Sequence, residues 1–162
     1  MAINGYLTLT AQKQGDIKGG VTQKGREGTI AVHAFNLQIF SPRDAATGLP
    51  TGKRQHEPIR ILKDVDKSTP LLWNALVNNE NLTSWILKFY APSPNGIEQQ
   101  VYTVSLTNAS IASISESMLD NEIPANANIP LREDITFTYQ KITWTWNEGG
   151  ITATDDWSSP IS

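Results

Sequence analysis

The fold is decided by residues 135–146, which read ITFTYQKITWTW. Most of these residues are β-branched or aromatic, and apolar side chains alternate with threonines, as in a strand with one dry face and one polar face. The apolar side chains stand on odd numbers up to Tyr139 and on even numbers from Ile142 onward. A strand that keeps one face inward across such a change of phase needs an extra residue. We therefore predict a β-bulge at Gln140-Lys141 that bends the sheet.

Other stretches of the chain carry the same strand pattern and are expected to pair with this one. Clusters of glycine, proline and asparagine separate them, which is typical of turns between strands. Two of the stretches also change phase, which predicts further bends. The predicted strands comprise residues 6–10, 29–40, 58–65, 82–90, 98–115 and 151–157, with a short one around Ile17.

One helix is predicted, over about residues 70–79. Thr69 suits the N-cap, and Pro70 fits the first helical position, where a missing N–H costs nothing. We expect this helix to flank the sheet structure. Mostly antiparallel strands with one flanking helix predict a bent antiparallel β-barrel or sandwich. The apolar side chains of the helix are Leu72, Trp73, Ala75, Leu76 and Val77.

The longest predicted loop covers residues 41–55. It mixes prolines and glycines with charged side chains, so neither strand nor helix periodicity continues through it. A loop of this length in a compact domain tends to be functional or mobile. We therefore treat residues 41–55 as the first candidate for a functional segment.

The composition excludes several classes of protein. The 162 residues are expected to form one domain over residues 1–162, and no apolar run reaches the roughly 18 residues that a membrane helix needs. Thirteen Lys and Arg residues are spread along a chain of net charge −3, which does not favour nucleic-acid binding. There is no cysteine. The N-terminal residues show neither the basic nor the apolar region of a signal peptide.

A search for catalytic or metal-binding patterns finds none that fits, so we predict no enzyme activity and no cofactor. His33 and His56 have no cysteine or acidic pair at metal-ligand spacing and are interpreted as structural or surface histidines. Residues 48–54 imitate a phosphate-binding loop but fail in glycine spacing. Residues 64–66 and 155–156 lack the spacing of a calcium loop, so their aspartates are interpreted as solvated charges or helix-start acids.

Five tryptophans leave one binding alternative open. If Trp144, Trp146 and Trp157 were exposed, they could form a platform for sugar rings on a monomeric β-sandwich. The alternation instead predicts that Trp144 and Trp146 are buried on the same face as Ile142. A third reading, an enzyme that uses a histidine with a carboxylate of the loop after residue 115, requires those groups to meet in a cleft.

The chain resembles the Hcp family, the tube protein of bacterial type VI secretion systems, over nearly its whole length. The most specific match is residues 66–70, Asp-Lys-Ser-Thr-Pro, directly before the predicted helix. The other matching segments are residues 15–19, 28–35, 41–44, 47–54, 63–72, 139–144, 149–150 and 155–157.

This resemblance implies a bent β-barrel with a flanking helix that assembles as a six-membered ring. It implies that rings stack into a tube, that a contractile sheath expels the tube with a spike protein at its tip, and that the lumen can hold small effector proteins. The protein would then reside in the cytoplasm before firing and be exported without a signal peptide. A phage-like tail-tube protein is the nearest alternative within the same fold.

The resemblance and the residues together give three sets of candidate contact residues. Sheet edges and the helix residues Trp73 and Val77 are candidates for contacts within a ring, because unpaired edge groups invite pairing. Ser113, Ser115, Ser117 and Asn121 are candidates for lining the lumen. The long loop is the candidate for contacts between stacked rings, through Ser41, Pro42, Arg43, Asp44, Thr47, Gly48, Thr51, Gly52, Lys53 and Arg54.

Overall fold

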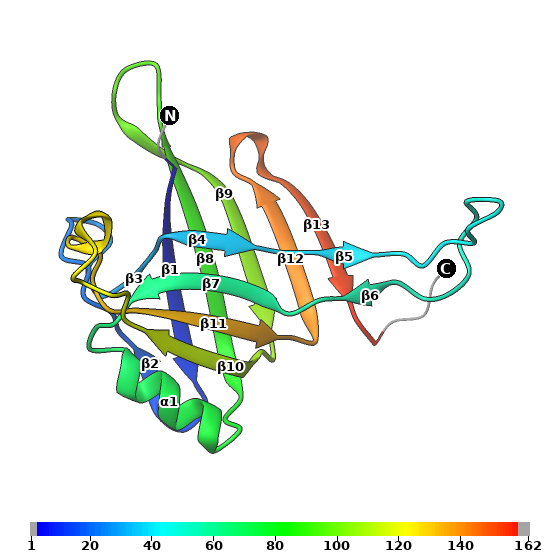
Figure 1. Ribbon diagram of the computed structural model, residues 1–162. Coiled ribbons are helices and arrows are strands. Elements are labelled where there is room, and N and C mark those ends of the chain that lie inside the picture. The colour runs from blue at the N-terminus through cyan, green and yellow to red at the C-terminus, as the bar shows by residue number, and fades with distance from the viewer. Residues whose placement is uncertain (1–2, 159–162) are drawn as a thin grey trace.

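A computed structural model describes residues 3–158 and confirms a mainly β fold with antiparallel sheets and one α-helix (Figure 1). The larger sheet has the strand order β13 (Ile151–Asp156), β12 (Lys141–Trp146), β9 (Glu98–Thr107), β8 (Leu82–Pro92), β1 (Asn4–Ala11) and β2 (Gly15–Ile17), with β3 (Ile30–Val32) also paired to β1. The second sheet has the order β10 (Ser110–Ser117), β11 (Arg132–Thr138), β7 (Ile59–Asp64) and β4 (Ala34–Asn36). A separate pair joins β5 (Ile39–Phe40) to β6 (Gln55–His56).

The core lies where the two sheets face each other. Buried residues alternate with half-buried or exposed ones along β1, β7 and β11, so each of these strands turns one face inward. Trp85 of the larger sheet and Phe137 of the second sheet meet edge to face in this core, with ring centroids 5.4 Å apart. The alternation that defined the strands in the sequence is therefore the alternation between core and surface.

The predicted bulge at Gln140-Lys141 is wrong, because residues 135–146 are two strands in two different sheets. β11 ends at Thr138 in the second sheet, and β12 begins at Lys141 in the larger one. The change of phase marks the corner at which the chain passes from the second sheet to the larger one. After this turn, the apolar side chains of β12 again point towards the core.

The same correction applies to the other two strands with a change of phase. Residues 98–115 divide into β9 and β10 around Asn108, which has a positive φ of 51°. The two corners contact each other, since the Asn108 side-chain amide donates to the side-chain oxygen of Gln140 at 2.8 Å. Residues 29–40 divide into β3, β4 and β5, each in a different sheet.

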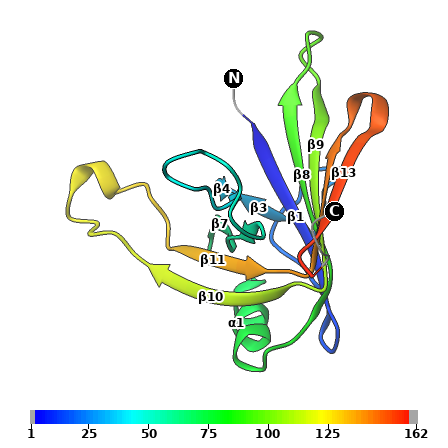
Figure 2. The same ribbon diagram turned by 90° about the vertical axis from the view of Figure 1, so that its right-hand side faces the viewer.

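The helix α1 runs from Thr69 to Val77, so it begins one residue earlier and ends two residues earlier than predicted. The prediction of Thr69 as the N-cap is wrong, because Thr69 is already helical and Ser68 occupies the N-cap, without a side-chain capping bond; Pro70 lies within the first turn. Asn78 is the C-cap. α1 packs against β10, with Leu72 and Ala75 buried and Val77 exposed (Figure 2). Two short 3-10 turns, Pro124–Asn126 and Glu148–Gly150, complete the described elements.

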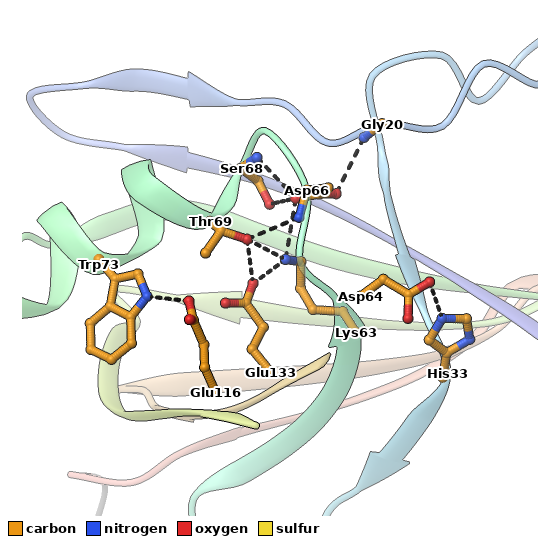
Figure 3. Close-up of polar contacts among 10 residues, drawn as sticks. All are labelled: Gly20, His33, Lys63, Asp64, Asp66, Ser68, Thr69, Trp73, Glu116 and Glu133. Carbon is orange, nitrogen blue, oxygen red and sulfur yellow. Dashed lines mark hydrogen bonds and ion pairs between the residues drawn. The ribbon is translucent and has the colours of Figure 1, made fainter. Parts of the chain in front are cut away.

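A buried ion pair joins the second sheet to the start of α1 (Figure 3). Lys63 of β7 and Glu133 of β11 are directly opposite in the strand register, fully buried, and in contact through Nζ and Oε1. The Thr69 hydroxyl donates to Glu133 Oε1 at 2.9 Å, and Asp66 lies 3.2 Å from Lys63 Nζ. Two strands and the helix start therefore meet at one polar cluster inside the protein.

We predict that Glu133→Leu destabilises the fold by about 3–5 kcal/mol, because it leaves the buried Lys63 ammonium without its main counter-charge. The double variant Lys63→Met/Glu133→Leu should recover most of that loss, since neither charge is then buried. Urea denaturation followed by circular dichroism measures both free energies of unfolding. Equal destabilisation by the single and the double variant would contradict this interpretation.

Candidate functional site

The segment between β5 and β6 projects away from the barrel as a long hairpin, which we call the arm (residues 41–54; Figure 1). Its position agrees with the predicted loop, except that Gln55 already belongs to β6. The arm has its own hydrogen bonds: the Thr51 N–H donates to the Pro42 carbonyl at 3.0 Å, and the Asp44 N–H donates to the Leu49 carbonyl at 2.8 Å. The arm is therefore a built hairpin rather than an irregular loop.

Asp44 organises the turn at the tip of the arm. Its carboxylate accepts a hydrogen bond from the Thr47 hydroxyl at 2.8 Å and another from the Ala46 N–H at 3.2 Å. These bonds, the Thr47 hydroxyl first, lower the pKa of Asp44, so its charge persists at neutral pH. Gly48 has a positive φ of 73°, which suits glycine at a tight turn. The tip presents an exposed, polar surface that also carries Leu49.

The base of the arm is held by a cluster that we call the arm clamp: Arg54, His56, Tyr139, Asp155 and Trp157. Asp155 Oδ2 accepts from Arg54 Nε at 2.6 Å and lies 2.7 Å from His56 Nε2. His56 Nδ1 lies 2.7 Å from the Tyr139 hydroxyl, and the Trp157 ring stacks on the imidazole at a centroid distance of 5.2 Å. The clamp thus fastens β6 to the corner at Tyr139 and to the end of β13.

Electrostatics within the clamp keep Asp155 charged and Tyr139 neutral. The hydrogen bond from Arg54 lowers the pKa of Asp155, and the bond to His56 lowers it further against the opposing effect of burial. Burial, helped by the Asp155 charge, raises the pKa of Tyr139 to about 12. In a neutral His56 imidazole, the phenol therefore donates to Nδ1 while Nε2–H donates to the carboxylate. The His56 side chain has no exposed surface, so the geometry supports a structural role.

The aspartates that we interpreted as solvated charges or helix-start acids are mostly paired within the chain. Asp64 lies 3.0 Å from His33 Nε2 and accepts from Arg132 at 3.2 Å. Asp66 does lie before the helix, but it also pairs with Lys63. Within residues 3–158, no cluster of three or more acidic or histidine side chains is placed to hold a metal ion. The pairings of Asp64 join distant segments, so sequence spacing carried no signal for them, whereas Lys63 and Asp66 are only three residues apart.

The other candidate residues lie on the second sheet and α1, apart from the arm. Trp73 Nε1 donates to Glu116 Oε1 at 2.6 Å, so this indole is engaged within its own chain (Figure 3). Val77 is 69% exposed. The lumen candidates, all exposed, are Ser113, Ser115 and Ser117, which alternate along the edge strand β10, and Asn121 in the following loop.

The prediction that Trp144 and Trp146 are both buried is wrong for the second of them. Trp144 is half-buried against the core, but Trp146 is 47% exposed at the end of β12. Alternation correctly assigned the face of the strand. It carries no information on how far the facing sheet extends, and β12 continues beyond the core.

The chain thus combines a bent antiparallel barrel, one flanking helix and a clamped hairpin arm, and the comparisons place this fold among secreted tube proteins. A family model described as the type VI secretion system effector Hcp matches residues 6–146. The chain therefore belongs to the Hcp family, whose members are structural tube proteins of type VI secretion. The resemblance read from the sequence is confirmed.

Individual relatives agree over nearly full length. A major exported protein of Pseudomonas aeruginosa is 39% identical over 171 aligned positions, which span 100% of this chain and 99% of the relative. An Hcp1 structure from E. coli EAEC 042 has a TM-score of 0.85 and 33% identity, covering 96% of this chain and 99% of that one. The secreted protein Hcp3 of Pseudomonas aeruginosa has a TM-score of 0.80 and 32% identity, covering 98% and 100%. Among the described residues, no helix is both long and apolar enough to cross a membrane.

We predict that Asp155→Asn lowers the free energy of unfolding by about 1–3 kcal/mol at neutral pH, because it weakens charge-assisted bonds to Arg54 and His56. The matched control is Asp134→Asn, whose partner Arg60 is far more exposed, and it should cost only about 0–1 kcal/mol. Urea denaturation of the three proteins measures the difference. Equal losses in the two variants would show that the clamp is no stronger than a surface ion pair.

The effect of Asp155 should also depend on pH in a defined direction. The folded state lowers the pKa of Asp155. The ionised carboxylate therefore contributes fully to the free energy of unfolding above the unfolded-state pKa of about 3.9, and this contribution is lost as the pH falls through the lower pKa of the folded state. The stability difference between wild type and Asp155→Asn should therefore be steady from about pH 7 to pH 5 and shrink below about pH 4. A difference that grows on acidification would contradict the assignment.

Proposed function

We propose that this protein is the structural subunit of a type VI secretion tube. Its chains form hexameric rings, the rings stack into the inner tube, sheath contraction expels that tube, and effector proteins travel in its lumen. The protein resides in the cytoplasm before firing and is exported without a signal peptide. Membership of a family of tube proteins and the export named for the Pseudomonas aeruginosa relative support this proposal.

The observation that carries the proposal is the arm, which projects from the barrel with a fixed base and an exposed tip (Figure 1). A contact segment that is already ordered loses less conformational entropy on binding than a flexible loop does. The hairpin bonds and the arm clamp supply this order. We therefore assign the arm to the contact between successive rings.

The charges on the arm suit a contact that is weak in each subunit and repeated around the ring. Arg43 and Lys53 are exposed, and Asp44 is partly exposed near the tip. An exposed ion pair contributes only about 0–1 kcal/mol, and salt screens it. Arg54 was a candidate for contacts between rings, but its guanidinium group donates hydrogen bonds to the Asp155 carboxylate and the Asp156 carbonyl within its own chain. We assign Arg54 to holding the arm.

We assign the edge strand β10 to the lumen, where Ser113, Ser115 and Ser117 would present small polar side chains to effector cargo. Short hydroxyl side chains offer hydrogen bonds without large apolar contacts, which suits transient holding of varied proteins. The remaining partners in this proposal are the contractile sheath around the tube and the spike at its tip.

Exposure of Trp146 favours one alternative, a monomeric carbohydrate-binding module. The groove beside this indole is lined by aliphatic and aromatic side chains such as Phe89 and Val101. Sugar sites instead combine an aromatic platform with several convergent polar groups. The tube subunit is therefore the better supported function.

Removal of the arm tip tests the stacking assignment. We predict that deletion of residues 45–51 leaves rings of about six times the 17.8 kDa chain mass but abolishes tubes. Light scattering on a sizing column measures the rings, and negative-stain images of the same fraction reveal the tubes. Tubes that persist in the deletion variant would overturn the role of the arm.

A charge reversal separates a specific contact from loss of the whole tip. Lys53→Glu on the arm should reduce tube length at low salt, whereas Lys13→Glu, an exposed lysine outside the arm, should not. The expected reason is repulsion at a close contact between rings, which added salt should relieve. Equal effects of the two substitutions would indicate a general response to net charge.

A further inference from the structure

One end of the larger sheet carries an apolar groove of about 580 Å³ that the arm and the clamp do not use. We call it the apolar groove and define it by the six side chains Ile3, Phe35, Phe89, Val101, Tyr102 and Trp146. These residues come from the start of the chain and from β4, β8, β9 and β12, so the groove is a feature of the assembled barrel.

The groove continues into an exposed sheet edge. Ile151, the strand partner of Trp146, is 66% exposed, and Ile3 is 61% exposed. β13 is the outer strand of the larger sheet, and its residues 151–154 are exposed and uncharged. Monomeric proteins usually protect such an edge with charges, prolines or bulges. An apolar groove beside an unprotected edge is typical of a surface that another chain covers.

A second exposed apolar surface lies on the loop between β10 and β11, residues 118–131, which we call the apolar loop. Met118 is 67% exposed, and Leu119, Ile123 and Leu131 are each more than 40% exposed. Hydrogen bonds order this loop. The Asp120 carboxylate accepts from the Glu122 N–H at 3.0 Å, and the Asp120 main-chain carbonyl accepts from the Asn126 side-chain amide at 3.2 Å. Figures 1 and 2 both show the loop far from the ends of β9, β12 and β13 that carry the groove.

We propose that the apolar loop of one copy seats in the apolar groove of the next copy, which makes this pair of surfaces the contact within a ring. The inference rests on the proposed ring assembly and names the partner of each surface. A head-to-tail interface needs two different patches at separate places on the same chain, and it closes into a ring when the rotation allows. The chain has two such patches, both apolar, and ring closure removes every copy of both from water.

This assignment differs from the helix contact through Trp73 and Val77. Trp73 already donates its indole N–H to Glu116 in its own chain. Val77 is 69% exposed, but it is a single apolar side chain, whereas the apolar loop exposes Met118, Leu119, Ile123 and Leu131 together. The helix is therefore the competing surface in the experiment below.

Charge substitutions give the first test. Trp146→Glu in the groove and Leu119→Glu in the loop should each shift the ring peak on a light-scattering column to the mass of a single chain, 17.8 kDa. Val77→Glu, at a more exposed apolar position on α1, should keep the ring. Circular dichroism at neutral pH verifies that each variant is folded. Rings that survive both Trp146→Glu and Leu119→Glu would overturn the proposal, as would a ring lost only with Val77→Glu.

Disulfide trapping gives a second test that does not depend on weakening the contact. Every disulfide must then form between introduced cysteines, because the chain itself contains none. The double variant Leu119→Cys/Trp146→Cys should give an oxidised ladder of up to six chains on a non-reducing gel. An equal mixture of the two single variants should give pairs of chains and no larger species, because each chain then carries one cysteine and can form only one disulfide. The control pair Leu119→Cys/Val77→Cys should give no ladder.

The outcomes separate this inference from the proposed function. A wild-type ring with no ladder in the Leu119→Cys/Trp146→Cys variant would overturn the surface assignment and leave the tube function standing. A wild-type chain that stays single, and forms no tube at any concentration or with added spike protein, would overturn both.

Discussion

The buried pair of Lys63 and Glu133 is the constraint on which the rest of the structure depends. Two opposite charges lie in the interior on neighbouring strands, and the Thr69 hydroxyl joins them to the first turn of α1. A buried charge is tolerated only with its partner in place, so the pair selects one register between β7 and β11. That register positions the second sheet and the helix, and through β11 it positions the corner at Tyr139.

The arm is an extension of this framework, although its tip touches none of the core. Its base is held by His56 and Arg54, whose partners come from the corner at Tyr139 and from Asp155 at the end of β13. Each bond is modest alone, but together they fix where the hairpin emerges. A projecting hairpin with a rigid base can carry directed contacts that a flexible loop of the same length cannot hold.

The exposed apolar surfaces of the molecule are typical of a subunit in a larger assembly. Soluble single chains seldom leave an apolar groove, an uncharged sheet edge and an apolar loop open together. Here the groove around Trp146 and the loop around Leu119 lie at separate ends of one barrel, while polar groups gather on the arm. The two kinds of surface suit the two kinds of contact that we propose, an apolar one within a ring and a polar one between rings.

Local patterns in the sequence predicted most of the strand segments, the helix, the place of the arm and the family, because alternation, a helix-start proline and matching segments are all local. The contacts between distant segments established that residues 135–146 cross between two sheets, that Asp155 meets Arg54 and His56, and that Trp146 is exposed. A local pattern tells which face of a strand is apolar. It holds no information on the distant segment that covers that face, and about 100 residues separate Arg54 from Asp155.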